Sequence, residues 1–197
     1  MAFAALRRGL DLVARKTAQA LVTAPLSKTA LSLAGLPHDG QTEFLASASG
    51  RPRAQMILLA PRMRLCCALN PHAGDAGLFG NEETGVLAKA ASLALRRGLP
   101  LSGPLPADAA WHEHRVGSLS GLVCLYHDQA LIALKAVAGF GVVNWTVGLP
   151  FVRTSPGHGT GFDLAASSQA FGLVEASGTI EAMGLAARLC ARRSREV

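Results

Sequence analysis

Two histidines stand in short motifs that could bind a metal ion. His72 follows an apolar run in "ALNPHAGDAGLFGNEE" (68–83), and His127 follows another in "GLVCLYHDQ" (121–129). Neutral imidazole is the commonest metal ligand among side chains, and Asp128 beside His127 could orient its ring. Two histidines are too few for a closed site, because a catalytic zinc uses three protein ligands and a water. Each histidine could equally lie in a hydrogen-bonded turn.

A second group of residues could bind a phosphate or a carboxylate. Lys135 and Arg153 supply positive charge, and Asn144 adds a neutral amide. Lysine and arginine bind such anions through charge-assisted hydrogen bonds. Both could instead be surface charges with buried aliphatic stems. The net charge of +6 favours an anionic substrate.

A glycine-rich turn, "SPGHGTGFDLA" (155–165), leads into a helical pattern. Its glycines, at positions 157, 159 and 161, let the backbone approach a ligand. Asp163 could accept hydrogen bonds from hydroxyl groups. The turn is neither the dinucleotide-binding GxGxxG nor a Walker loop, so alone it indicates an anion site, with a nucleotide site left open.

Short apolar runs alternate with helical patterns, which is typical of an α/β protein with a mixed or parallel sheet in three layers. A chain of 197 residues suits one globular domain, although a second small lobe stays open. The patterns predict strands at 20–25, 56–61, 63–69, 141–150 and within 121–129, and helices at 1–16, 27–37, 82–98 and from 179 onward.

Composition argues against several classes of protein. No apolar run approaches the roughly 18 residues that span a bilayer, and no signal peptide is recognisable, so we expect no membrane partner. The 4 cysteines lack zinc-finger spacing, which favours a reducing, cytoplasmic compartment. Arginine pairs are scattered and aromatic residues are few, so nucleic-acid binding is not expected.

Seven motifs from about Ala20 onward together resemble the 4-hydroxythreonine-4-phosphate dehydrogenase family of pyridoxal phosphate biosynthesis. In chain order they are "LVTAPLSK", "GQTEFLA", "LNPHAGDAG", "GPLPAD", "YHDQALIALK", "VNWTVGLPFVRTS" and "HGTGFDLA". The resemblance implies an incomplete, isocitrate/isopropylmalate-dehydrogenase-like α/β fold, with 1–197 forming a single unit that corresponds to the C-terminal part of the family. It also implies a homodimer with its site at the interface.

The implied reaction is NAD-dependent oxidation and decarboxylation of 4-phosphooxy-L-threonine to 3-amino-2-oxopropyl phosphate, assisted by a divalent metal such as Zn, Mg or Co. Relatives that oxidise other hydroxy acids, such as 4-phosphoerythronate, share the motifs. The resemblance implies roles for the following residues: His72 and His127 as metal ligands; Gln41, Thr42, Lys135, Asn144 and Arg153 for the substrate; His158, Gly159, Thr160 and Asp163 for the cofactor; Lys135 and Asp128 in catalysis.

The chain also departs from the family pattern. Gln41 stands where the family has histidine, and Gly157 where it usually has aspartate. A segment that carries the third metal-ligand histidine is absent before Asn70, and the family's N-terminal stretch is missing. His38 and Asp39 are nearby, but nothing indicates that they substitute. We therefore expect little or no turnover. A non-catalytic, dimerising remnant and a metal-dependent hydrolase remain as alternatives.

Overall fold

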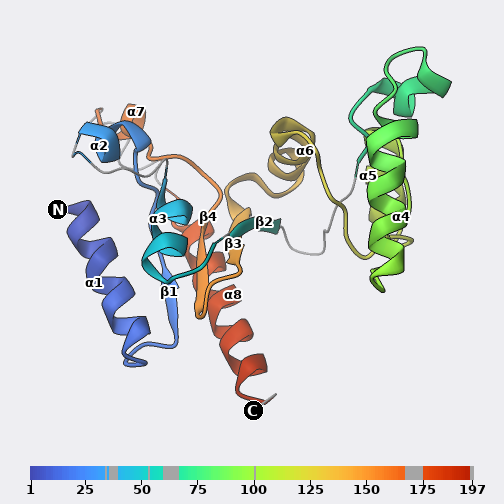
Figure 1. Ribbon diagram of the computed structural model, residues 1–197. Coiled ribbons are helices and arrows are strands. Elements are labelled where there is room, and N and C mark those ends of the chain that lie inside the picture. The colour runs from blue at the N-terminus through green and yellow to red at the C-terminus, as the bar shows by residue number, and fades with distance from the viewer. Residues whose placement is uncertain are drawn as a thin grey trace. The chain divides into compact units, whose positions relative to one another are not determined.

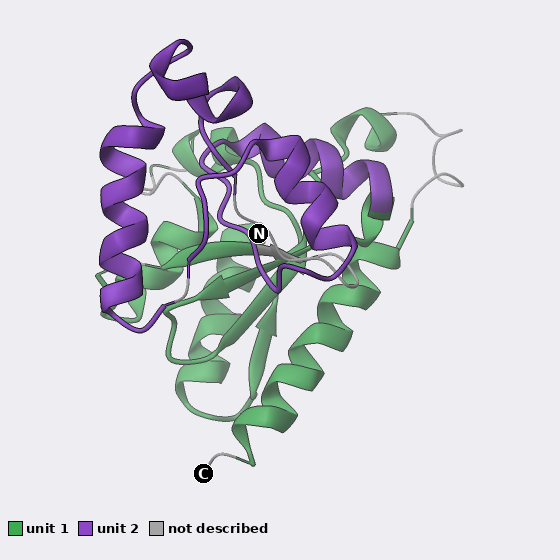
Figure 2. Cartoon of the chain, turned by 90° about the vertical axis from the view of Figure 1, so that its right-hand side faces the viewer, with its two compact units in different colours: residues 1–59, 138–197 green, residues 60–137 purple. Residues whose placement is uncertain are grey.

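The computed structural model describes residues 1–33, 35, 40–52, 54–59, 67–99, 101–166 and 175–195. The chain divides into two compact units (Figure 2). Unit 1 comprises Met1–Leu59 and Ala138–Val197, and unit 2 comprises Ala60–Val137. That residues 1–197 form a single α/β unit stays a prediction.

Unit 1 contains a four-stranded mixed sheet in the order β1-β4-β3-β2. β1 pairs in parallel with β4, whereas β3 is antiparallel to both β4 and β2. This arrangement confirms the mixed sheet and the strands predicted near 20–25, 56–61 and 141–150. The strand bounds are β1 Ala20–Val22, β2 Gln55–Leu59, β3 Val143–Val147 and β4 Val152–Pro156.

Helices cover both faces of this sheet, which confirms the three layers (Figure 1). α8 (Ser177–Arg193) packs on one face, where the Thr154 hydroxyl donates to Ala182 O at 2.9 Å. Successive side chains of a strand point to opposite faces, so Arg153 and its partner Leu21 face the other way. On that side lie α1 (Ala2–Ala14) and α3 (Gln41–Ala48), with an apolar core of Leu6, Val13, Leu45 and Phe151.

The remaining elements of unit 1 are short. The predicted helix at 27–37 is confirmed as α2 (Lys28–Leu33), although residues 34 and 36–39 lie outside the described residues, His38 and Asp39 among them. The turn after β4 leads into α7 (Phe162–Ala165), as its pattern predicts. A 3-10 turn, η3 (Gly139–Gly141), precedes β3.

Unit 2 is helical in its described part. The predicted helix at 82–98 is confirmed as a π-helical turn, η2 (Glu83–Leu87), that continues as α4 (Ala88–Arg96). Two further helices are α5 (Ala107–Arg115) and α6 (His127–Ala138), whose last residue belongs to unit 1.

One strand prediction in unit 2 is wrong, and another falls mostly outside the described residues. Residues 121–126 form no strand element, and His127 begins α6. The polar "YHDQ" ends the apolar run. Gln129 Oε1, in the first turn of α6, accepts from the backbone N–H groups of Leu125 and Tyr126 at 3.3 Å, much as the glutamine of a capping box does. Residues 67–69 of the predicted strand 63–69 are irregular, and 63–66 lie outside the described residues.

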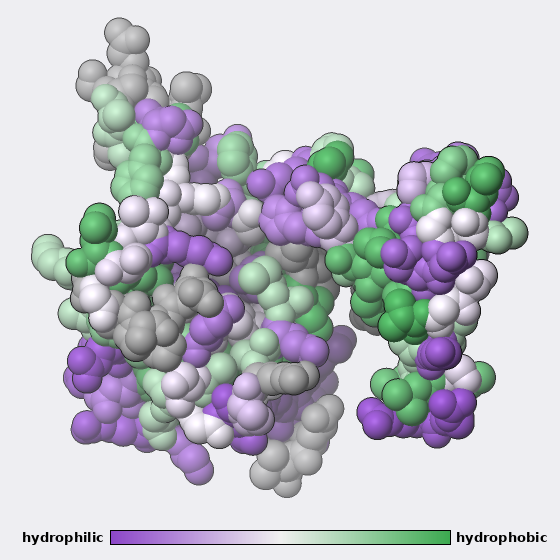
Figure 3. All heavy atoms as spheres, turned by 45° about the horizontal axis from the view of Figure 1, so that its top comes forward, coloured by the Kyte–Doolittle hydropathy of each residue, from purple (hydrophilic) through white to green (hydrophobic). Residues whose placement is uncertain are grey.

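Exposed apolar side chains are frequent at the surface, where they alternate with hydrophilic ones (Figure 3). α4 is fully described and buries none of its residues, and Leu93 and Leu95 are exposed. Within the described ranges, no helix is long and apolar enough to cross a membrane.

Candidate anion site and histidine loops

Arg153 lies in the middle of the sheet of unit 1. It stands on β4 opposite Leu21 of β1 and Thr146 of β3, and only 3% of it is exposed. Its Nη1 donates to the Thr146 hydroxyl at 2.8 Å. Its Nη2 donates to the Thr23 hydroxyl at 2.7 Å and to Gln41 Oε1 at 3.2 Å. Neutral oxygens from three elements therefore hold the guanidinium.

The charge of Arg153 is not paired with a carboxylate among the described residues. Burial lowers the pKa of Arg153 to about 10, and the negative charge of Glu43 acts in the opposite direction. Within the described part of the chain, the buried Nε atom has no acceptor, and the buried Asn144 Oδ1 on the same sheet face has no donor. A buried cation in these surroundings is costly unless an anion binds it. The cluster is therefore suited to an anionic ligand.

Gln41 and Thr42 begin α3 next to this cluster. Gln41 Nε2 donates to Ala24 O at 3.0 Å while its Oε1 accepts from Arg153, so the amide links the loop after β1 to the guanidinium. Thr42 is half-buried on the same turn of helix. A helix N-terminus also attracts negative charge. The structure thus places Gln41 against Arg153, and Asn144 on the same face of the sheet as Arg153. That these residues share a substrate site stays a prediction.

The His72 motif forms a left-handed turn, η1 (Pro71–Gly77). Five consecutive residues, 72–76, have φ between +42° and +80°, and Gly74 is the only glycine among them. Such a conformation costs roughly 1–2 kcal/mol for each non-glycine residue. The turn leaves His72 exposed, with its ring 6.2 Å from that of Phe79.

Glu83 anchors this turn. It is 4% exposed, and its Oε1 accepts from the backbone N–H groups of Leu69 at 3.0 Å and Asn70 at 2.8 Å. The Asn70 amide donates to Glu83 Oε2 at 3.0 Å and to Glu82 Oε2 at 2.7 Å. The hydrogen bonds, first that from Asn70 N–H, lower the pKa of Glu83 although burial opposes them. A side chain at Gly74 would displace its surroundings, because a Cβ would lie 2.8 Å from the backbone oxygen of Gly80 and 2.8 Å from Glu83 Oε2.

The other candidate residues of unit 2 lie on α6. His127 Nδ1 contacts Asp128 Oδ1 at 2.6 Å, and both side chains are exposed, which leaves Nε2 of His127 available to a metal. Lys135 is also exposed, two turns further along α6. No group of three or more His, Cys, Asp or Glu side chains among the described residues could hold a metal ion. The described residues of one chain therefore offer the imidazoles of His72 and His127 but not a complete donor set.

The candidate cofactor residues form an exposed turn after β4. Gly159, Thr160 and Asp163 are exposed, while His158 Nδ1 contacts Gly159 O at 2.9 Å and its Nε2 is buried without a partner among the described residues. Gly157 has no room for a side chain, because a Cβ would lie 2.9 Å from Val142 O. An aspartate at position 157 would therefore require a different backbone.

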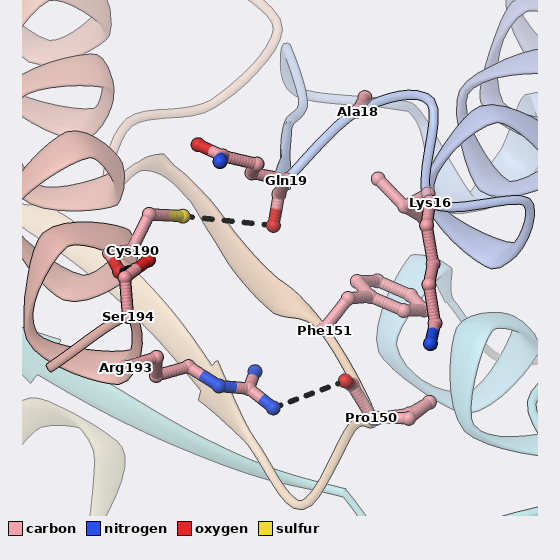
Figure 4. A pocket seen from close by; sticks show the side chains of 9 residues that line it. Lys16, Ala18, Gln19, Pro150, Phe151, Cys190, Arg193 and Ser194 are labelled. Carbon is pink, nitrogen blue, oxygen red and sulfur yellow. Dashed lines mark hydrogen bonds between the residues drawn. The ribbon is translucent and has the colours of Figure 1, made fainter. Parts of the chain in front are cut away.

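A separate cavity of about 470 Å³ in unit 1 contains none of these residues (Figure 4). Two of its polar side chains, those of Arg193 and Cys190, donate hydrogen bonds to backbone oxygens. Arg193 donates to Pro150 O at 3.2 Å, and the Cys190 thiol donates to Gln19 O at 3.5 Å. We therefore place the candidate chemistry at the Arg153 cluster and not here.

Sequence patterns did not single out Thr23, Thr146 or Glu83. The sequence contains a signal for Thr146, because Asn144 and Thr146 occupy alternate positions of "VNWTV" and so share a sheet face. Thr23 and Glu83 come from segments whose pairing is visible only in the fold.

Comparison with known proteins identifies a family. The sequence profile described as "Pyridoxal phosphate biosynthetic protein PdxA" matches residues 1–67 and 64–186. A 4-hydroxythreonine-4-phosphate dehydrogenase of Bradyrhizobium diazoefficiens is 34% identical over 241 residues, covering 98% of this chain and 69% of the relative. One from Caulobacter vibrioides is 35% identical, covering 94% and 69%. The crystal structure of the Klebsiella pneumoniae enzyme matches with a TM-score of 0.77 at 31% identity, covering 95% and 69%.

These matches also locate a difference in length. The alignment with the Bradyrhizobium enzyme runs over 241 residues whereas this chain has 197, so the relative has residues within the matched span that this chain lacks. The two profile matches adjoin at 64–67, directly before the Asn70 motif. The chain therefore belongs to the PdxA family of pyridoxal phosphate biosynthesis, is shorter than the family's solved structures, and shares their mixed α/β, isocitrate-dehydrogenase-like fold.

Proposed function

We propose that this chain binds a small phosphorylated hydroxy amino acid through the Arg153 cluster, which comprises Arg153 with Thr23, Gln41, Asn144 and Thr146. We also propose that it descends from an enzyme that oxidises 4-phosphooxy-L-threonine with NAD. The observation that carries the proposal is the buried guanidinium of Arg153, which has no carboxylate contact among the described residues. Family membership supplies the substrate class, because the relatives are named 4-hydroxythreonine-4-phosphate dehydrogenases.

The residues of the cluster have different proposed roles in binding the ligand. Arg153 offers its charge and the unpartnered Nε–H to the phosphate oxygens, and the Thr23 and Thr146 hydroxyls keep the guanidinium in place. Asn144 Oδ1 is an acceptor for a hydroxyl or amino group of the ligand. Gln41 hydrogen-bonds without the charge that an imidazolium would add, so phosphate affinity is lower than with histidine.

The proposed reaction moves a hydride from the alcohol carbon to NAD and the hydroxyl proton to a base, after which the β-keto acid loses carbon dioxide. Asp128 and Lys135 are the proposed proton-transfer residues, and the turn from His158 to Asp163 is the proposed cofactor loop. A divalent metal would polarise the hydroxyl when bound. Because the described residues of one chain do not complete its ligand set, no step here depends on it.

A second candidate function is binding without catalysis, favoured by the same incomplete donor set. NADH progress curves with 4-phosphooxy-L-threonine and added zinc, magnesium or cobalt separate the two. We expect turnover well below about one per second, the low end of usual enzymes. Faster turnover would show that the departures from the family pattern do not disable the site, and release of inorganic phosphate would favour a hydrolase.

A further inference from the structure

Unit 2 brings two cysteine sulfurs together from distant parts of the chain. The Sγ atoms of Cys67 and Cys124 lie 3.8 Å apart, and 57 positions separate the two residues in sequence. The backbone fixes this approach, because Cys67 N–H donates to Val123 O at 2.6 Å. A disulfide bond is about 2.05 Å long, so the two sulfurs must approach further for the bond to form.

The two thiols differ in accessibility and acidity. Cys67 is 2% exposed, whereas Cys124 is half-buried and therefore reachable by a small reagent. The hydrogen bond from Cys124 lowers the pKa of the Cys67 thiol, although burial opposes this effect. The thiolate is the reactive form in exchange with disulfides, so the buried sulfur is the better internal nucleophile.

We propose that Cys67 and Cys124 are a modification site that a small disulfide, such as oxidised glutathione, converts reversibly into an intramolecular disulfide. The Cys124 thiolate attacks one sulfur of the reagent, breaks its S–S bond and releases one thiolate, which takes up the proton lost by Cys124. The Cys67 thiolate then attacks Cys124 Sγ and expels the second reagent thiolate, which takes up the Cys67 proton. Two cysteines are oxidised, and one reagent disulfide is reduced to two thiols.

The position of the pair gives the bond a structural consequence. Cys67 comes shortly before His72 in sequence and Cys124 shortly before His127. Besides the bond from Cys67 N–H to Val123 O, a second hydrogen bond already joins the two segments, from Gln129 Nε2 to Ala68 O at 2.7 Å. A disulfide would add a covalent link between the same segments. Oxidation therefore restricts the motion of both histidine loops, whether or not the chain is a catalyst.

The test uses the full chain with Cys66→Ser and Cys190→Ser, so that only Cys67 and Cys124 remain. After exposure to oxidised glutathione we expect loss of both thiols, a mass lower by two hydrogen atoms, a peptide link between the two cysteines and full reversal by dithiothreitol. The matched control adds Cys124→Ser, which should retain its thiol or carry one glutathione. A stable glutathione adduct without the link, or two unreacted thiols, would overturn the proposal.

Peptide mapping of the wild-type chain after the same oxidation covers the case in which the double variant fails to fold. Fragmentation should place the link at Cys67, and a link from Cys66 or Cys190 would overturn the assignment.

Hydrogen exchange tests the consequence for the two histidine loops. Amides at 68–72 and 124–127 should exchange at least about tenfold more slowly after oxidation, because local opening is restricted. Unchanged exchange in both segments would refute the proposed coupling.

Discussion

The buried surroundings of one residue, Arg153, are enough to indicate a binding site without any ligand. Its guanidinium is buried against neutral oxygens, and one donor remains without an acceptor among the described residues. Folding alone gains little from such a charge, since apolar replacements of buried ions are often neutral or stabilising. The arrangement is explained if the charge serves a ligand, which is the basis of the proposed function.

Thr146 provides a stability test at this scale. Thr146→Val keeps the shape of the side chain but removes the acceptor of the 2.8 Å bond from Arg153 Nη1. We expect the free energy of unfolding to fall by roughly 1–3 kcal/mol, the usual cost of leaving a buried charged donor unsatisfied. Urea denaturation measures it, with the exposed Thr160→Val as control. An unchanged midpoint would mean that the bond contributes nothing.

Among the elements, the turn that carries His72 depends on a partner outside itself. Residues 72–76 adopt left-handed backbone conformations, and Glu83 holds the residues before them through two backbone hydrogen bonds. The side chain of Asn70 donates to Glu82 and Glu83, whereas the side chain of His72 is exposed. The anchored turn therefore presents the imidazole of His72 to solvent.

Acid should weaken this anchor. The folded pKa of Glu83 lies below its ordinary value of 4.5, so its contribution to stability is present above about pH 4.5 and is lost as the pH falls through the folded pKa. Glu83→Gln removes that dependence. The melting temperature of the wild type should exceed that of the variant near neutral pH, and the gap should narrow below about pH 4.5. A gap that stays constant with pH would contradict the assignment. Glu113→Gln is a control.

Sequence patterns predict some secondary-structure elements of this fold better than others. Alternating strands and amphipathic helices were predictable because their periodicity is local, as for α1, β3 and α8. The segments at 67–69 and 121–126 are not predictable in this way, because their hydrogen bonds join residues far apart in sequence, such as Cys67 to Val123 and Ala68 to Leu105. Arg153 was predicted as a substrate contact, but its burial depends on Thr23 and Gln41, which only the fold brings to it.

At the scale of the whole molecule, family membership does not establish the oligomeric state, which stays a prediction. Exposed apolar side chains such as Leu93 and Leu95 are compatible with a protein interface. We expect a homodimer, with the two histidines approaching a shared metal only when two chains pair. Light scattering should give twice the mass of one chain, and zinc should tighten the dimer in the wild type but not in His72→Ala. A monomer at micromolar concentration would contradict the expectation.

The most direct measurement is calorimetric titration of the chain with 4-phosphooxy-L-threonine, comparing the wild type with Arg153→Met and, as control, the exposed Arg96→Met. We predict binding by the wild type and the control, and at least about a tenfold loss of affinity, 1.4 kcal/mol, in Arg153→Met. That variant should unfold no earlier than the wild type without ligand, because it removes a buried charge. Equal affinity in Arg153→Met and the wild type, with both folded, would contradict the account.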